Sequence, residues 1–444
     1  MKKNVLTEGR ILTALLRFSL PVLFALFLQA LYGGIDLLIV GRFAETADVS
    51  GVATGSMFLQ TLTAVITGLA MGITIFVGYS IGERDREKTS RGIGTGLFLF
   101  LVIGLILTLV ITLCSADLAR LMKAPEHAFR QTDQYIMICG MGMVFVVAYN
   151  VLSSIFRGLG DSKTPLLTVA IACVVNILGD LLLVKGFGLG AAGAALATVF
   201  AQGISVVVSV LIIRRQTLPF DFGLRYIRFD GRIARKEMQL GLPIGFQEFL
   251  VGLSFVVIQV IVNMIGVVES AGVGVAEKIT VFIMLVPSAY MQAMSAFVAQ
   301  NIGAGKPERA DRALLYGCVS SVTIGIVMGY FAFFHGDLLA GLFTEDAAVV
   351  AAAHDYLKGY AIDCLLVGFL FCFIGYFNGR EKTLFVMVQG LVGALCVRIP
   401  IVYAMSLMEG ATLFHISLGT PSASVVQIIM CMTMLVHMKM AKKK

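Results

Sequence analysis

Apolar residues fill twelve long stretches of this 444-residue chain, and short polar segments separate them. A helix that spans a membrane takes roughly 20 predominantly apolar residues, and each stretch reaches that length. The stretches are residues 15–40, 52–81, 92–114, 134–156, 165–184, 188–213, 238–266, 271–302, 313–334, 355–377, 383–408 and 413–438. The pattern therefore predicts an all-α integral membrane protein with twelve transmembrane helices. An even number of spans places both ends of the chain on the same side.

The composition agrees with a multi-pass protein and leaves no room for a soluble domain. Hydrophobic residues make up 58% of the chain and charged residues only 14%, against about 25% charged residues in soluble proteins. The first apolar stretch, from Leu15 to Val40, is too long for the core of a signal peptide, so we interpret it as a retained span.

The distribution of basic residues predicts the orientation in the membrane. With a cytoplasmic N-terminus, most of the 34 Lys and Arg residues fall on inner segments, as the positive-inside rule requires. We therefore expect both termini in the cytoplasm and a location in the inner (plasma) membrane of a prokaryote. The same bias explains the net charge of +7, so we expect contact with membrane lipids and no nucleic-acid partner.

The two halves of the chain resemble each other. FVGYSIGERDREKTSR at 76–91 aligns with FVAQNIGAGKPERADR at 297–312, and the same register matches other positions along the chain. We expect two pseudo-symmetric six-helix lobes, residues 1–213 and 237–444, joined by a basic cytoplasmic linker at 214–236. Parallel repeats of this kind are typical of secondary transporters.

Two aspartates stand within apolar spans of the first half, where a charged side chain costs about 2.5–3.5 kcal/mol. Asp36 and Asp180 lie near the outer ends of spans one and five, at similar depth. Asn176 shares a helix face with Asp180, and Thr198 follows in span six. Two neighbouring carboxylates do not both ionise cheaply, so the set predicts a site for a proton or for a hard cation such as sodium. The alternative is that each aspartate caps its helix near the interface.

Other polar residues within the spans are candidates for a substrate cavity. Three acids of the second half are available to attract a cationic substrate, although a structural ion pair of one of them with Arg398 is an equal alternative. We expect the cavity to be lined by Gln29, Tyr32, Tyr135, Asn150, Glu248, Gln259, Glu277 and Asp363.

Several motifs carry a resemblance to a known family. These are Leu-Pro in spans one and seven, Q-x-x-Y-x-x-x-D at 29–36, F-R-G-x-G-D-x-x-T-P at 156–165, N-x-x-x-D at 176–180 and GLGAAGAALAT at 188–198. In this order and spacing they resemble the multidrug and toxic compound extrusion (MATE) family over essentially the whole chain. The paired aspartates look most like its DNA-damage-inducible F branch.

The resemblance implies a secondary active antiporter. It would export cationic or amphipathic organic compounds in exchange for protons or sodium ions, by alternating access between the lobes, as a monomer. It would need no cofactor beyond the coupling ion. The resemblance also associates bending of the first span with cation binding, which makes Pro21 a candidate hinge; the alternative is a static kink.

Two other classes of function fit the sequence less well. A lipid-linked sugar flippase of the same superfamily would need a basic cavity, but only Lys278 and Arg398 lie within spans, against five acids. An intramembrane enzyme would need a clustered nucleophile and base or a metal set, and none is visible, so we expect no enzymatic activity. GLGAAG at 188–193 satisfies G-x-G-x-x-G but lacks the strand–helix context of a dinucleotide site, and close helix packing explains it better.

Overall fold

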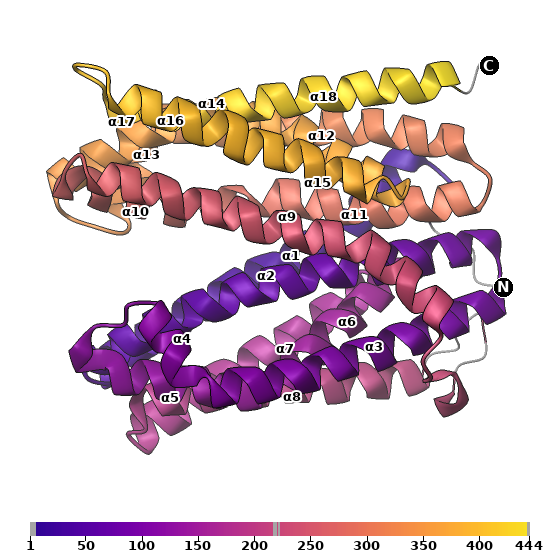
Figure 1. Ribbon diagram of the computed structural model, residues 1–444, viewed down its shortest axis with the longest axis horizontal. Coiled ribbons are helices and arrows are strands. Elements are labelled where there is room, and N and C mark those ends of the chain that lie inside the picture. The colour runs from indigo at the N-terminus through magenta and orange to yellow at the C-terminus, as the bar shows by residue number, and fades with distance from the viewer. Residues whose placement is uncertain (1–5, 216–219, 221–222, 442–444) are drawn as a thin grey trace. The chain divides into compact units, whose positions relative to one another are not determined.

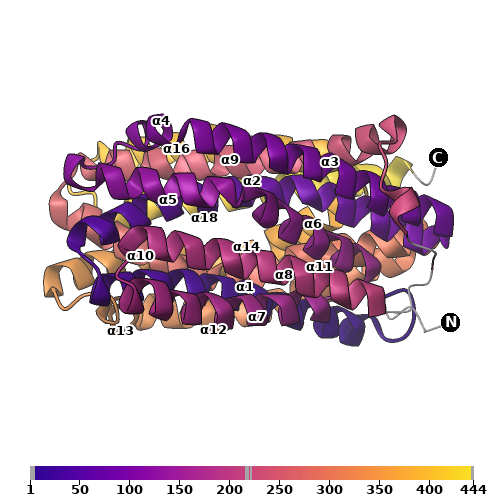
Figure 2. The ribbon, with the colours of Figure 1, turned by 90° about the horizontal axis from the view of Figure 1, so that it is seen from below.

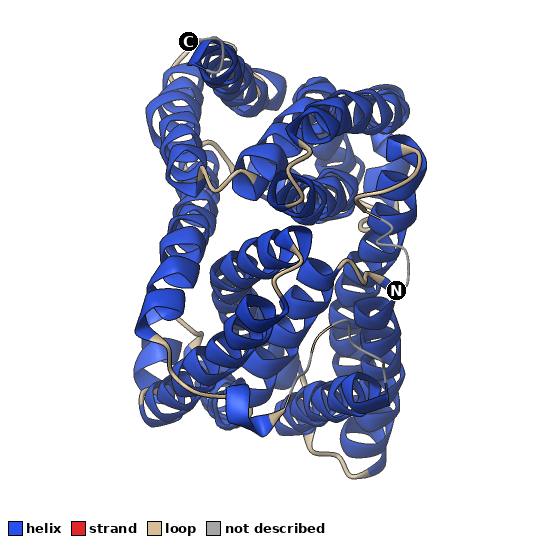
Figure 3. Cartoon of the chain, turned by 90° about the vertical axis from the view of Figure 1, so that its right-hand side faces the viewer, coloured by secondary structure: helices blue, strands red, loops and turns tan. Residues whose placement is uncertain are grey.

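The computed structural model describes residues 6–215, 220 and 223–441, and over this part of the chain it contains helices and loops but no strand (Figure 3). Both ends of the chain, whose cytoplasmic location is predicted above, lie outside the described residues. So do residues 216–219 and 221–222 of the predicted linker.

The helices follow one another with short connections (Figure 1). Those of the first half are α1 (Ile11–Phe43), α2 (Thr46–Glu83), α3 (Arg86–Leu113), α4 (Ser115–Leu121), η1 (Glu126–Ala128), α5 (Phe129–Met141), α6 (Met143–Leu159), α7 (Lys163–Asp180), η2 (Leu181–Gly186) and α8 (Gly190–Arg215). Those that follow are η3 (Leu224–Tyr226), α9 (Gly231–Asn263), α10 (Val267–Ile283), α11 (Leu285–Gly303), α12 (Pro307–Phe334), α13 (Gly336–Gly341), α14 (Ala347–Gly379), α15 (Thr383–Leu391), η4 (Val392–Arg398), α16 (Ile399–Ser406), α17 (Leu413–Ser417) and α18 (Gly419–Ala441).

Local sequence signals place the helix ends. Asp85 precedes α3 and accepts a hydrogen bond from the backbone N–H of Lys88, which caps the first turn. Gly160 ends α6 in the left-handed conformation, with φ 83°, which favours glycine. Pro307 opens α12, where its missing N–H has no helical partner to lose.

The number of spans agrees with the apolar pattern. By length and composition, 11 helices of the described chain could cross a membrane. One bent pair of helices, counted together as a single span, brings the number to 12. That pair, Glu126–Met141 with Met143–Leu159, bends by 54° within the predicted span 134–156. Gly142 lies at the bend, where a Cβ would come within 2.4 Å of the Val199 side chain. The absence of a side chain thus lets α8 approach the bend closely.

The chain forms two compact units. The first contains Arg17–Gly245 and Ala299–Gly305 with the segment ending at Glu8; the second contains Gly9–Leu16, Phe246–Val298 and the chain from Lys306 onward. The lobe and linker boundaries expected at 213 and 237 stay a prediction.

In the first unit, α2 packs against α5 and α6, and α7 lies beside α8 (Figure 2). The N-terminal half of α9 also packs closely against α2 in this unit. A Cβ on Gly68 would lie 2.8 Å from the Cα of Gly245, and one on Gly241 would lie 2.1 Å from the carbonyl oxygen of Leu69. Small residues thus bring the two backbones together, as in other membrane helix pairs.

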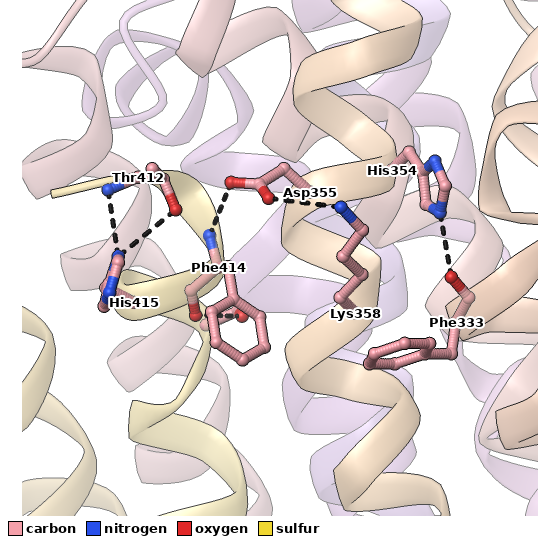
Figure 4. A network of polar contacts seen from close by, with 8 residues as sticks. Phe333, His354, Asp355, Lys358, Thr412, Phe414 and His415 are labelled. Atoms are coloured by element: carbon pink, nitrogen blue, oxygen red, sulfur yellow. Dashed lines mark hydrogen bonds and ion pairs between the residues drawn. The ribbon is translucent and has the colours of Figure 1, made fainter.

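In the second unit, α14 contacts α10, α12, α17 and α18, which makes it the central helix. Polar contacts secure its first turns (Figure 4). Nε2 of His354 lies 2.9 Å from the carbonyl oxygen of Phe333 on α12. The backbone N–H of Phe414 on α17 donates to Oδ2 of Asp355 over 2.9 Å. These contacts fix α14 between α12 and α17.

Each half carries a π-helical segment in its fifth span. In the first half, η2 follows directly on Asp180, and in the second, η4 ends at Arg398. Such segments are rare and often accompany functional sites. Asp180 thus directly precedes the first π-helical segment, and Arg398 is the last residue of the second.

Candidate functional site

Three helices of the first unit bring Asp36 together with its predicted partners. Oγ1 of Thr198 on α8 donates to Oδ2 of Asp36 on α1 over 3.3 Å. Nδ2 of Asn176 on α7 donates in turn to Oγ1 of Thr198 over 3.5 Å. Asp36 is 5% exposed and Asn176 1% exposed, so the cluster is buried within the unit.

Asp180 completes this group from the last turn of α7. Its side chain is fully buried, and its carboxyl group lies close enough to that of Asp36 to interact directly. Hydrogen-bond geometry leaves both oxygens of Asp180, and Oδ1 of Asp36 and of Asn176, without a partner among the described residues. The four residues predicted as a cation or proton site therefore lie together.

The chemistry of this cluster suits a proton or a hard cation. Its unpartnered atoms are all oxygens, which are the ligands that hard cations prefer. No Lys or Arg forms an ion pair with either carboxyl group in the described chain. Two buried carboxyl groups in this position need a proton or a cation to limit their mutual repulsion. No group of three His, Cys, Asp or Glu side chains suited to a metal ion occurs among the described residues.

Polar side chains continue from Asp36 along one face of α1. The side-chain amide of Gln202 donates to the hydroxyl of Tyr32 over 3.4 Å. One turn further, the amide of Gln29 donates to the hydroxyl of Tyr149 over 3.3 Å. The spacing of Gln29, Tyr32 and Asp36 predicts this shared face. Their hydrogen-bond partners on α6 and α8 are brought to it by the packing of the helices.

The two other predicted cavity residues of the first half are buried in the same unit. Tyr135 on α5 is 2% exposed, and its hydroxyl group lies near enough to Asp36 and Thr198 to interact with both. Asn150 on α6 accepts a hydrogen bond from Oγ1 of Thr67 over 2.9 Å and donates to the carbonyl oxygen of Val146 over 2.8 Å. Tyr135 thus lies at the aspartate cluster, while Asn150 is held by α2 and by its own helix.

A second polar cluster lies in the second unit. Asp363 on α14 is 1% exposed and interacts with Arg398. Glu277 on α10 interacts with Tyr356 and Tyr360, which stand one helical turn apart on α14. Arg398 also interacts with both tyrosines, so two of the predicted acids share one environment with the buried arginine.

Arg398 is held in this environment by contacts to α9. Its Nη1 donates to Oγ of Ser254 over 3.2 Å, and its guanidinium lies 4.6 Å from the centre of the Phe255 ring. No ion pair within 4.0 Å joins it to an acid in the described chain, so its relation to Asp363 is one of nearby opposite charges rather than direct contact.

The remaining two predicted cavity residues lie elsewhere on α9. Gln259 donates to Oδ1 of Asn263 over 2.8 Å and to Oγ of Ser270 over 3.2 Å, where α9 ends and α10 begins. Glu248 is partly exposed, and the sequence places it three turns away from Gln259. The hydrogen bonds of Gln259 thus join α9 to the beginning of α10, and a cavity role for Glu248 and Gln259 stays a prediction.

Sequence reasoning did not single out Glu237, which follows the basic stretch at 214–236. The structure buries this side chain to 1% exposure, with neither carboxyl oxygen hydrogen-bonded to a described residue. Because Arg235 and Lys236 directly precede Glu237, the sequence there has the pattern of a polar loop. Its spacing of four from Gly241 was the only available signal of a packed helix face.

Pro21 lies inside α1 and is partly exposed, fifteen residues before Asp36 on the same continuous helix. The proline removes one helical hydrogen bond and so weakens the helix locally. Its role as a hinge stays a prediction.

Comparison with known proteins supports this architecture. The chain is 25% identical over 420 residues to the probable multidrug resistance protein YoeA of Bacillus subtilis. This alignment covers 93% of this chain and 91% of YoeA. The chain is also 27% identical over 403 residues to the probable multidrug resistance protein YpnP of the same organism, in an alignment that covers 90% of this chain and 89% of YpnP.

Among solved structures, the fold matches the outward-facing conformation of a multidrug resistance MATE family transporter of the MOP superfamily. The TM-score is 0.93 at 21% identity, covering 100% of this chain and 99% of that one. The model of the MatE family matches twice, over residues 21–182 and 243–404. The two matches together cover well over half of the chain, which therefore belongs to the MatE family of membrane transporters.

Proposed function

We propose that this protein is a secondary active multidrug efflux antiporter. The observation that carries the proposal is the buried group of Asp36, Asp180, Asn176 and Thr198 in a membrane-spanning unit, with oxygen atoms that lack partners. An ionisable pair inside a membrane protein is by default a functional site. The names of the Bacillus subtilis relatives, which describe probable multidrug resistance proteins, support the same class of cargo.

The coupling ion is a proton or a sodium ion bound between Asp36 and Asp180. Each pH unit across the membrane supplies about 1.4 kcal/mol per proton, and each 100 mV adds about 2.3 kcal/mol per charge. The proposal needs no other cofactor and no enzymatic step. Asn176 and Thr198 orient the pair and supply further oxygen ligands.

The cargo is a cationic or amphipathic organic compound. Gln29, Tyr32 and Tyr135 present aromatic and amide groups beside the aspartates, and aromatic faces attract organic cations. In the second unit, Glu277 and Asp363 would add negative charge, in part offset by Arg398. Glu248, Gln259 and Asn150 would contribute polar contacts along the route.

Transport proceeds by alternating access between the two lobes, with Pro21 as the hinge of the first helix. The paired aspartates favour the DNA-damage-inducible F branch within the family. We further propose that the protein works as a monomer, surrounded by membrane lipid, with both termini in the cytoplasm of a prokaryotic cell.

One observation keeps a lipid-linked sugar flippase as the alternative. Arg157 at the end of α6 and Arg398 are both buried, at 8% exposure each, and neither forms an ion pair in the described chain. Buried arginines can bind pyrophosphate. Five acids within the predicted spans nevertheless favour a cationic cargo.

The proposal is tested with purified protein in proteoliposomes loaded with an ethidium-like dye. A proton gradient and a sodium gradient are imposed separately, with and without a membrane potential. We expect dye movement that one of the two gradients drives and that an ionophore for that ion abolishes. Dye movement that neither gradient affects would contradict antiport.

A further inference from the structure

We propose that Glu237 is a proton-binding site of its own, distinct from the aspartate cluster, and that it is protonated whenever α9 is packed against α2 and α3. This site does not depend on the antiport proposed above. It rests on the surroundings of one carboxyl group near the beginning of α9, within the first unit.

The carboxyl group is enclosed between two other helices. Glu237 is 1% exposed, and a Cβ on Gly96 of α3 would lie 3.4 Å from its Oε2. On α2, a Cβ on Gly72 would lie 2.3 Å from the carbonyl oxygen of Glu237. The side chain of Ile73 fills the space beside Gly96, with its Cδ1 2.8 Å from the same Cβ position. The side chain therefore has apolar neighbours and no free path to solvent.

Among the described residues, no group around this carboxyl satisfies a negative charge. Both carboxyl oxygens lack hydrogen-bond partners among the described residues. The charged side chains on the elements around Glu237 are Asp48 and Glu83 on α2, Arg86, Glu87, Lys88 and Arg91 on α3, Arg225, Arg228 and Asp230 before α9, and Arg232, Arg235, Lys236 and Glu248 on α9. Lys88 pairs with Glu83 and Arg91 with Asp230, and none of these groups interacts with the Glu237 carboxyl.

A buried ion without a partner is among the most costly arrangements in a protein, and a carboxyl group avoids it by keeping its proton. The neutral acid fits the apolar surroundings. The proton is therefore part of the packed arrangement, because it binds the packed form more tightly than the separated form, in which the carboxyl group is exposed to water.

The backbone contacts determine how the proton can leave. The crossing of α9 over α2 is tight along two turns, because Gly241 and Gly245 lie against Leu69 and Val65 without intervening side chains. Glu237 cannot swing out while these contacts persist, so ionisation requires α9 to separate from α2. From Phe246 onward the same helix belongs to the second unit. The proton on Glu237 thus stabilises the packing of the N-terminal half of α9 on α2 within the first unit.

Infrared spectroscopy of the full-length purified protein tests the protonation directly. At pH 7.5, the spectrum of wild type minus Glu237→Gln should contain the C=O stretch of a protonated carboxylic acid. The matched control is Glu87→Gln, which removes an exposed acid from the first turn of α3. Its difference spectrum should contain only carboxylate bands. Carboxylate bands alone for Glu237→Gln would overturn the proposal.

The pH dependence of stability provides a second readout. Wild type should lose Tm relative to Glu237→Gln as the pH rises from 6 to 9, by about 2–4 °C or more, because only the wild type must ionise a buried acid. Parallel curves for the two proteins would count against a bound proton.

A third measurement needs no variant. Hydrogen exchange of peptides from 66–76 and 233–245 in the wild type should accelerate with pH beyond the rise that hydroxide catalysis alone gives, because ionisation opens the α2–α9 contact. Peptides from the rest of the first unit serve as the internal reference. Exchange that rises by the same factor in all peptides would refute the linkage between the proton and the helix contact.

Discussion

Oγ1 of Thr198 donates a hydrogen bond to Oδ2 of Asp36 over 3.3 Å, from the third turn of α8 to the last turns of α1. This contact joins two spans that lie 162 residues apart in the chain. Asn176 extends it to α7, where Asp180 faces the same carboxyl group. Substitutions in this group separate a coupling role from a purely structural one.

Asp36→Asn should abolish gradient-driven dye efflux while the protein still inserts and folds. The amide keeps the shape of the side chain but neither exchanges a proton nor balances a cation. If Asp36 only capped its helix, asparagine would serve nearly as well. Dye efflux from proteoliposomes is the measurement, with Glu87→Gln as the control for removal of an acid. Efflux at the wild-type rate in Asp36→Asn would exclude the coupling role.

Thr198→Val should weaken the binding of the coupling ion without abolishing transport. The substitution removes a hydroxyl that donates to Asp36 and accepts from Asn176, and a hydrogen bond to a charged group contributes about 1.5–3 kcal/mol. We expect the ion concentration for half-maximal efflux to rise about tenfold or more. Thr198→Ser keeps the hydroxyl and should restore the wild-type value. Equal values for the Val and Ser variants would show that the hydroxyl does not act on the ion.

Cysteine labelling tests the predicted orientation. In a variant without its eight native cysteines, Arg84→Cys between α2 and α3 and Arg225→Cys in η3 should react only with reagent that reaches the cytoplasm. Both positions are exposed. Glu126→Cys, exposed in η1 on the predicted outer side, should react with impermeant reagent added to intact cells. The reverse pattern would invert the topology.

A pair of glycine substitutions tests the contact between the repeat-related helices α2 and α11. A Cβ on Gly303 would lie 2.2 Å from the carbonyl oxygen of Tyr79, and one on Gly82 would lie 2.2 Å from that of Gln300. Gly303→Ala should therefore destabilise the protein by about 1–3 kcal/mol, seen as a lower Tm in detergent. Gly274→Ala on α10 meets no atom within 4 Å and should leave the Tm unchanged or raised. A similar Tm for both variants would mean that the helices do not meet so closely.

The ion pair of Arg91 with Asp230 predicts an acid-sensitive contribution to stability. The hydrogen bond from Arg91 lowers the pKa of Asp230 from its ordinary value, and the backbone N–H groups of Ile233 and Arg232 act in the same direction. The folded-state pKa is thus below the unfolded one. The stabilisation is therefore present above about pH 4 and lost as the pH falls through the lowered pKa.

Asp230→Asn measures this contribution, since asparagine still caps α9. Arg91 is partly exposed, so the loss at neutral pH should be modest, about 0.2–1 kcal/mol. Unfolding by denaturant at pH 7 and at pH 3 should show a difference between variant and wild type that shrinks toward acid. A difference that is constant with pH would show that the carboxylate charge is not involved.

The apolar pattern was sufficient to predict the all-helical membrane fold and the number of spans. Each stretch is long enough to satisfy its own backbone as a helix, so this property depends on local composition alone. The shared face of Gln29, Tyr32 and Asp36 follows from helical spacing in the same way. Which side chains share a face within one helix could be predicted, because the geometry of an α-helix is the same in every protein.

Contacts between helices could not be predicted in this way, because the residues on one face of a helix do not specify which other helix packs against that face. Nothing in the spacing of α9 indicates that Glu237 is enclosed by Gly72 and Gly96, or that Gln259 donates to Ser270 at the beginning of α10. Glycine backbones that meet within van der Waals distance set the packing of α9 on α2. That packing, rather than the charged neighbours of Glu237 in the chain, determines its burial.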